Sequence, residues 1–260
     1  MSAMTARVVA MPPRTVSGSQ PYLRAVTRPA AACSTCKSMP FCLACSSATD
    51  SAAVDALVTQ RIRLRKGESL VRSGDAFTGL FAVRSGSCKT VVTTTGGQEQ
   101  IAGYHIAGDI LGAQAIYAHA HDCTITALED SDFCVLPFDR METLARQSAE
   151  FQHKFNAVLS REIGRERRLM LMLGTMRAEQ RLAAFLLDLA DRYHARGYSS
   201  SEFVLRMTRE EIGSHLGLKL ETVSRLFSRF HQEGLIQVQG RDVKILDRMA
   251  LTQLVDATLQ

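Results

Sequence analysis

Glycine residues interrupt the chain at short, irregular intervals between positions 67 and 108, and this spacing limits the possible fold more than any other feature. The segments between the glycines are rich in Val, Leu, Phe and Thr, as in residues 68–72, 80–84 and 89–94. Short β-prone runs separated by glycine turns are typical of a small barrel or roll. We therefore expect such a β domain over residues 51–140.

A long helical segment follows the β region. Between Phe151 and Leu173 the apolar residues recur with helical periodicity, and Gly164 is the one Gly or Pro among them. We expect a helix over residues 141–176. Heptad spacing indicates a seam that a two-stranded coiled coil would bury, with Asn156, Ile163 and Met170 at a positions and Leu159, Glu166 and Leu173 at d positions.

Glu166 is the charged residue of this seam. In a homodimer it would face its own copy, and two carboxylates in a partly dry interface oppose pairing unless they are protonated or neutralised, with Arg165, Arg167 and Arg168 nearby. We expect a weak, poised dimer whose interface contains Leu159, Ile163, Glu166, Met170 and Leu173. With a one-residue change of register, Glu166 would instead lie on the solvated flank of the helix.

The C-terminal part of the chain, residues 177–260, carries a helix-turn-helix pattern. Thr208 and Glu211 form a capping-box pair that opens a helix from Arg209 to about Leu216, and Gly217 ends it. A second helix is expected from about Leu220 to Glu233. A hairpin with strands at 235–238 and 243–246 follows and supplies a wing, so we predict a winged helix-turn-helix that binds DNA.

The second helix divides into an apolar face and a polar face. Val223, Leu226, Phe227 and Phe230 form the stripe expected to face the core. The opposite face is expected to contact DNA: Glu221, Ser224 and Arg225 toward base edges, and Lys219 and Arg229 toward phosphates. An ordinary helical hairpin with a solvated face would show the same polarity, as would a ligand-binding module that does not bind DNA.

Seven cysteines are present, and four of them lie between positions 33 and 45. The preceding 32 residues contain basic residues but no long apolar run, so we expect a disordered basic arm over 1–32 and a cysteine loop over 33–50. No apolar segment approaches the roughly 18 residues that span a membrane, which favours a cytoplasmic chain with reduced thiols. Clustered thiols in that setting indicate a metal or redox site.

The cysteine spacing is Cys33-x2-Cys36-x5-Cys42-x2-Cys45, a possible four-thiolate set. Thiolates are soft ligands for zinc, copper(I) or iron–sulfur clusters, and the spacing alone does not separate zinc from iron–sulfur. Cys88 and Cys123 lie in strand-like runs and are expected to be small buried thiols. A buried thiol is also the default interpretation of Cys134 taken alone.

Several segments resemble one family. The sequence of residues 220–230, LETVSRLFSRF, is similar to the recognition helix of the CRP/FNR superfamily of transcription regulators, and specifically of its FNR (fumarate and nitrate reduction regulator) branch. Residues 97–101, 103–108, 108–111 and 178–185 are also similar. The resemblance covers nearly everything after Cys33. It implies an α+β chain with a β-roll (double-stranded β-helix or jelly-roll-like) sensor domain, a dimerisation helix and a winged helix-turn-helix.

The resemblance also implies a site and partners. Cys33, Cys36 and Cys42 look like the family's three N-terminal cluster ligands, and Cys134 matches the fourth, so a [4Fe–4S] cluster is expected, with Cys45 as an alternative ligand. The implied function is oxygen-responsive activation or repression of transcription at a TTGAT-type inverted repeat. The implied partners are double-stranded DNA, a second copy of the chain and RNA polymerase. A zinc-stabilised or thiol-redox regulator is the alternative.

Two activities are not expected. The cyclic AMP branch of the superfamily uses a Gly-Glu-Leu turn and an arginine clamp, but Ala113 or Gln114 stands in place of the glutamate and no arginine lies between Arg84 and Arg140. Cyclic-nucleotide binding is therefore not expected. The sequence has no phosphate loop, Ser-His-Asp spacing or metalloprotease helix, so the chain is not expected to be an enzyme.

Overall fold

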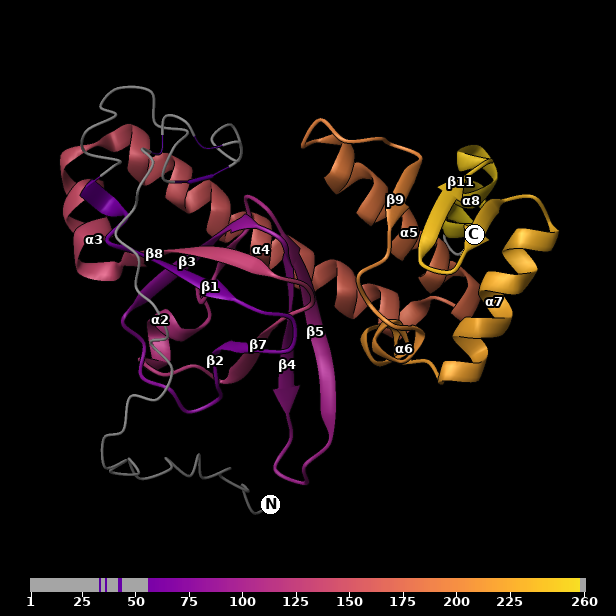
Figure 1. Cartoon of the computed structure of the whole chain (residues 1–260), viewed down its shortest axis with the longest axis horizontal. Coiled ribbons are helices and arrows are strands. Elements are labelled where there is room, and N and C mark those ends of the chain that lie inside the picture. Colours follow the sequence, from indigo (N-terminus) through magenta and orange to yellow (C-terminus); the bar gives the residue numbers. More distant parts are fainter. Residues whose placement is uncertain (1–32, 34–35, 37–41, 44–55, 258–260) are drawn as a thin grey trace, which may run out of the picture.

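The computed structural model describes Cys33, Cys36, Cys42, Leu43 and residues 56–257. The expected basic arm, most of the cysteine loop and Cys45 lie outside the described residues. The described chain forms a β-roll, a long helix and a C-terminal domain, and Figure 1 shows the long helix running from the roll to that domain.

The roll consists of two four-stranded antiparallel sheets with the strand orders β1-β8-β3-β6 and β2-β7-β4-β5. Its elements are β1 Gln60–Leu64, β2 Ser69–Val71, β3 Gly79–Ser85, β4 Ser87–Thr93, β5 Glu99–Ile106, β6 Ile110–Leu111, the short helix α2 Ala115–Ala118, β7 Cys123–Ala127 and β8 Ser131–Pro137. The two sheets close over a shared apolar core that includes Phe81, Ile125 and Phe133. The predicted β-roll is confirmed.

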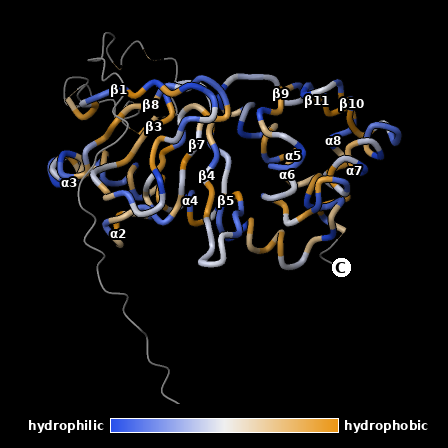
Figure 2. The backbone as a smooth tube through the Cα atoms, turned by 60° about the horizontal axis from the view of Figure 1, so that its bottom comes forward, coloured by the Kyte–Doolittle hydropathy of each residue, from blue (hydrophilic) through white to orange (hydrophobic). Residues whose placement is uncertain are grey.

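Gly86 illustrates how the glycine pattern shapes the roll. It joins β3 to β4 with a φ of +83°, a conformation that L side chains rarely adopt. A Cβ atom there would also lie 2.8 Å from the Asp130 carbonyl oxygen. Along the strands, residues facing the core alternate with less buried ones, as in β7, and Figure 2 shows hydrophobic and hydrophilic residues interleaved through the roll.

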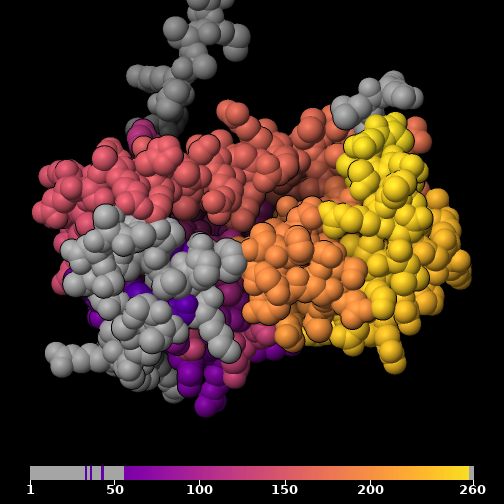
Figure 3. Space-filling view, turned by 90° about the horizontal axis from the view of Figure 1, so that it is seen from above, coloured from indigo at the N-terminus to yellow at the C-terminus, as the bar shows by residue number. Residues whose placement is uncertain are grey.

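Two helices, rather than one, occupy the segment expected to be a single helix over 141–176. They are α3 Phe138–Gln147 and α4 Ala149–Thr175. Ser148 separates them in an extended conformation, and its side chain accepts a hydrogen bond from the Phe151 backbone N–H as an N-cap. The 27 residues of α4 span about 40 Å, and Figure 3 shows this helix along one side of the molecule.

The C-terminal domain packs four helices around a three-stranded sheet of order β10-β11-β9. Its elements are α5 Ala178–His194, β9 Glu202–Val204, α6 Arg209–Leu216, α7 Leu220–Gln232, β10 Ile236–Gln239, β11 Asp242–Ile245 and α8 Arg248–Asp256. The hairpin of β10 and β11 confirms the predicted wing, whereas β9 and α8 were not predicted. Among the described residues, no helix has the length and apolar character needed to cross a membrane.

The C-terminal domain docks on the roll through α6 and β5. The Ile101 N–H donates to the Ser214 hydroxyl over 3.0 Å, and His215 Nδ1 lies 3.0 Å from the Ile101 carbonyl oxygen. Lys89 on β4 donates to Glu211 over 2.7 Å. The helix that opens the helix-turn-helix is therefore bonded directly to the sensor sheet.

Candidate DNA-reading surface and cysteine site

The capping box that begins α6 has the predicted geometry. Thr208 Oγ1 accepts from the Glu211 N–H over 3.1 Å, and Glu211 Oε2 accepts from the Thr208 N–H over 2.7 Å. Gly217 follows α6 with a φ of +63°, the left-handed conformation that ends a helix. A Cβ atom on Gly213 would lie 2.6 Å from the Leu218 carbonyl oxygen, so the turn passes close to α6. These contacts fix the angle at which α7 leaves the turn.

The apolar stripe of α7 lies in the core, as predicted. Val223 and Phe230 are completely buried, and Leu226 and Phe227 are also buried. Glu221, Ser224 and Arg225 are exposed on the other side. Among the described residues, Glu221 and Arg225 form no side-chain hydrogen bond or ion pair. Their side chains are therefore free to meet a partner.

The two residues expected at phosphates differ in their surroundings. Lys219 is exposed at the N-cap of α7. Arg229 donates over 2.7 Å to Glu233, one turn ahead, and over 2.7 Å to Glu179 on α5. A phosphate would therefore have to compete with two carboxylates for Arg229. The sequence pattern did not reveal Glu179 because it precedes Arg229 by 50 positions.

Three of the predicted cluster ligands lie in one apolar cluster. Cys33, Cys42 and Cys134 are each 7% exposed and pack with Leu57, Leu80, Met141 and Phe151 among others. Cys134 reaches this cluster from the middle of β8, where it pairs with Arg61 on β1 and Ala82 on β3. Cys36 is less buried, and its backbone N–H donates to the Cys33 carbonyl oxygen over 2.9 Å.

The chemistry of these donors fits a thiolate-bound centre. Burial raises the pKa of the Cys134 thiol to about 11, as do the nearby Cys42 and Cys33, against the opposing effect of Arg61. A metal would therefore have to displace protons on binding. Within the described part of the chain, no three His, Cys, Asp or Glu side chains form a ready-made coordination geometry. The donor types and their shared apolar surroundings fit the expected ligand set.

Cys88 and Cys123 are buried in the roll, as expected. Cys88 on β4 is completely buried, and Cys123 on β7 is 1% exposed. Cys123 accepts a hydrogen bond from Gln114 Nε2 over 3.0 Å, and burial raises the pKa of its thiol to about 12. Both thiols belong to the core between the two sheets, whereas Cys134 belongs to the cluster around Cys33 and Cys42.

One face of α4 presents the predicted dimer residues to solvent. Ile163 is 52% exposed and Met170 is 73% exposed, large values for apolar side chains. Asn156 and Glu166 are exposed on the same face, and Leu159 and Leu173 are half-buried beside it. Arg165 is not positioned to neutralise Glu166, because it donates instead to Glu162 and to Asp109.

A buried aspartate that the sequence patterns did not single out connects the roll to the helices. Asp109, in the turn between β5 and β6, is 4% exposed and accepts from Arg165 on α4 over 3.2 Å. It also accepts from Arg192 on α5 and from Arg196, two residues after the end of that helix, each over 2.6 Å. Burial acts to raise the pKa of Asp109, but the three guanidinium charges outweigh it and hold that pKa well below its usual range.

Comparisons with known proteins agree with this geometry. Residues 61–148 match the family described as "Cyclic nucleotide-binding domain", and residues 180–254 match the "Crp-like helix-turn-helix domain". The transcriptional regulatory protein btr of Bordetella pertussis is 44% identical over 87% of this chain and 94% of its own length. The fumarate and nitrate reduction regulatory protein of Escherichia coli is 38% identical over 79% and 82%.

A solved structure agrees as well. The structure of FixK2 from Bradyrhizobium japonicum has a TM-score of 0.69 to this chain at 27% identity, and the match covers 75% of this chain and 96% of that one. The Crp-like helix-turn-helix family and the relatives named as regulatory proteins agree with the expectation that the chain is not an enzyme. The resemblance seen in the sequence is confirmed. The chain belongs to the CRP/FNR family and is a DNA-binding transcription regulator of its FNR branch.

Proposed function

We propose that the protein is a cytoplasmic, oxygen-responsive transcription regulator in which Cys33, Cys36, Cys42 and Cys134 hold a [4Fe–4S] cluster. When bound, such a cluster supplies an inorganic centre that oxygen can destroy. Residues 51–140 act as the sensor, residues 141–176 as the dimerisation segment and residues 177–260 as the DNA-binding domain. The relative named as a fumarate and nitrate reduction regulatory protein supports this assignment.

The observation that carries the proposal is the position of Cys134. It follows Cys42 by 92 positions, yet both thiols lie in one apolar cluster with Cys33. The same cluster contains Met141 of α3 and Phe151 of α4. A change in how Cys33 and Cys42 pack would therefore reach the first turn of α4 through this shared apolar cluster. This route links the thiols to the helix that carries the dimer seam.

Two copies would pair along α4 through Leu159, Ile163, Glu166, Met170 and Leu173. The exposed apolar side chains of Ile163 and Met170 support this pairing. Each copy would place α7 in the major groove of a TTGAT-type inverted repeat, with Glu221, Ser224 and Arg225 at base edges and Lys219 and Arg229 at phosphates. RNA polymerase would be the protein partner at the promoter.

The roll would bind no cyclic nucleotide, despite the description of the matched family. In the described chain, apolar side chains such as Val71, Phe81 and Ile125 fill the space between the sheets. Gln114, near the position of the family glutamate, donates to Cys123. A phosphodiester there would meet Asp122 rather than an arginine.

Metal analysis of protein purified without oxygen tests the cluster. We expect about four iron and four sulfide per chain in the wild type. Cys134→Ser should lose the iron, whereas the matched control Cys123→Ser, another buried roll cysteine, should keep it. Cys45→Ser tests the alternative ligand and should also keep the iron. Zinc without iron would support the zinc-stabilised regulator instead, and a metal-free, colourless protein would contradict both.

A further inference from the structure

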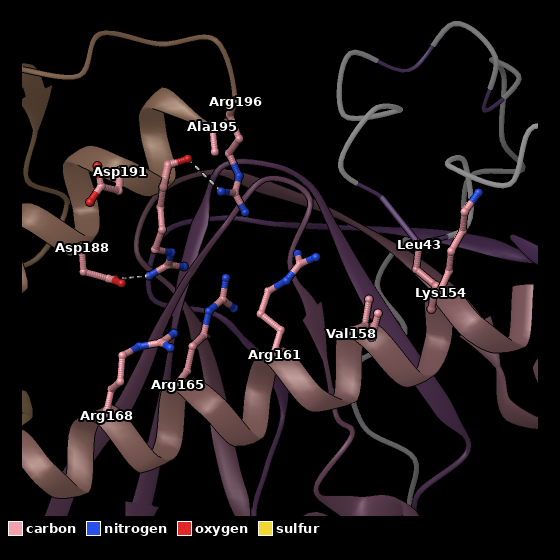
Figure 4. Close-up of a pocket in the computed structure, with 12 residues that line it drawn as sticks. Leu43, Lys154, Val158, Arg161, Arg165, Arg168, Asp188, Asp191, Ala195 and Arg196 are labelled. Carbon is pink, nitrogen blue, oxygen red and sulfur yellow. Dashed lines mark hydrogen bonds and ion pairs between the residues drawn. The ribbon is translucent and has the colours of Figure 1, made fainter. Parts of the chain in front are cut away.

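A basic cavity lies between α4 and α5. Its volume is about 510 Å³, and six basic side chains line it against two acidic ones, Asp188 and Asp191. In Figure 4, Arg161, Arg165 and Arg168 project from α4 into the same space as Arg196, which follows the end of α5. The basic residues are Lys154, Arg161, Arg165, Arg168, Arg192 and Arg196. The cavity therefore combines positive charge from two helices.

Most of these charges already have partners. Arg192 and Arg196 donate to Asp109, and Arg165 donates to Asp109 and Glu162. The acidic side chains are also engaged: Asp188 lies 3.6 Å from Arg192, and Asp191 accepts from Arg248 on α8, outside the cavity.

Arg161 and Arg168 differ from the other lining cations. Neither makes a side-chain hydrogen bond or an ion pair with any described residue, although Arg165, between them on α4, makes both. Positions 161, 165 and 168 are separated by four and three residues, so they lie on one helix face. On the wall of the cavity, two guanidinium groups that have no partner in the described part of the chain therefore flank an arginine whose charge is already paired.

The dimer seam does not occupy this face of α4. Ile163 and Met170 differ from Arg161 and Arg168 by two positions each, which is more than half a helical turn. The two sets of side chains therefore point to nearly opposite sides of α4. A second copy paired through the exposed apolar residues would leave the arginine face open toward α5.

We propose that this cavity binds a small phosphorylated anion with at least two negative charges. Guanidinium groups match the geometry of phosphate oxygens and bind them through paired hydrogen bonds. The volume suits a ligand of metabolite size. No aromatic side chain is among the described residues that line the cavity, so phosphate groups rather than a stacked base provide the recognition. A bound anion contacts α4 and α5 together and so joins the dimer helix to the DNA-binding domain.

Titration calorimetry of the full-length chain with inorganic pyrophosphate tests the proposal. We expect saturable binding by the wild type and at least a tenfold loss of affinity in Arg161→Ala/Arg168→Ala. Arg161→Lys/Arg168→Lys retains the charge without the planar fork and should bind with intermediate affinity. Arg146→Ala removes an exposed arginine on α3 outside the cavity and should bind like the wild type. Circular dichroism checks that each variant is folded.

The DNA-reading surface also attracts anions, so Arg225→Ala is the control that distinguishes binding there from binding in the cavity. It should bind pyrophosphate like the wild type. Loss of binding in Arg225→Ala but not in Arg161→Ala/Arg168→Ala would overturn the proposal. So would the absence of saturable binding at millimolar pyrophosphate, or equal affinity in the wild type and the double alanine variant.

Discussion

The DNA-reading helices and the cysteine site are assembled over different distances along the chain. The capping box, the turn at Gly217 and the buried stripe of α7 lie within 23 consecutive positions, 208–230. The cysteine site joins Cys33 and Cys42 to Cys134, 92 positions after Cys42, and depends on β8 being correctly placed between β1 and β3. The first site forms with its own helices, whereas the second depends on the whole roll.

Loss of a core aromatic residue should have the largest effect on the locally built site. Phe230→Ala empties a completely buried position on α7 and should lower the free energy of unfolding of the C-terminal domain by about 3–5 kcal/mol. Chemical denaturation monitored by circular dichroism measures it. If the domain is independent of the cysteine site, the iron content of the folded variant stays at the wild-type value. A parallel loss of iron would show that the cysteine site depends on the C-terminal domain as well as on the roll.

Loss of a base-reading arginine should weaken DNA binding without unfolding the C-terminal domain. Arg225→Ala should reduce the binding free energy for the palindromic site by about 1–3 kcal/mol, because a bidentate contact to guanine is lost. Lys219→Ala should instead weaken binding to all sequences and lower the salt dependence. Gel shifts over a salt series distinguish the effects of the two substitutions. If Arg225→Ala lost the same affinity for the palindromic site and for random DNA, Arg225 would not contact bases.

Acid should destabilise the roll through His105. This ring lies 2.8 Å from Thr90 Oγ1, and desolvation lowers its pKa from 6.5 to about 4. Between these values the unfolded chain takes up a proton that the folded chain does not. The free energy of unfolding should therefore fall as the pH falls from about 6.5 to 4, by up to about 1.4 kcal/mol per pH unit from this group.

His105→Gln should reduce that slope by the contribution of one proton, while His215, whose pKa desolvation also lowers, keeps a share of it. Denaturant unfolding at a series of pH values provides the measurement. An unchanged slope in His105→Gln would show that other groups carry the pH dependence.

The smallest effect is expected at the capping box. Thr208→Ala removes the acceptor for the Glu211 N–H and should cost about 1 kcal/mol, whereas Thr208→Ser keeps the hydroxyl and should cost little. Thermal unfolding of both variants gives the difference. Equal transition temperatures for the two variants would show that the hydroxyl does not stabilise α6.

Local patterns predicted much of the fold and of the DNA-reading surface. Thr208 with Glu211, Gly217 and the stripe ending at Phe230 each act over a few residues, so their geometry follows from spacing alone. The glycine turns likewise predicted the roll. The break at Ser148 was not predicted because the apolar periodicity begins only at Phe151, and a single serine does not by itself mark the start of a helix.

Contacts between distant positions could not be predicted from such patterns. Asp109 meets Arg192 and Arg196 across more than 80 positions, and Arg229 meets Glu179 across 50. Nothing near these residues in the sequence marks their partners. Cys134 is similar: in its own segment it reads as a buried strand cysteine, and only the family resemblance selected it as a ligand.

Measuring DNA binding with and without air shows whether the cysteine-bound cluster controls the DNA-reading surface. One oxygen-free preparation is divided, half is exposed to air, and the affinity of each half for the same palindromic site is measured by fluorescence anisotropy. We predict an iron-loaded protein that binds tightly without oxygen and loses affinity together with its iron in air, while Cys134→Ser binds weakly in both conditions. Equal, tight binding by an iron-free wild type in both conditions would contradict this prediction.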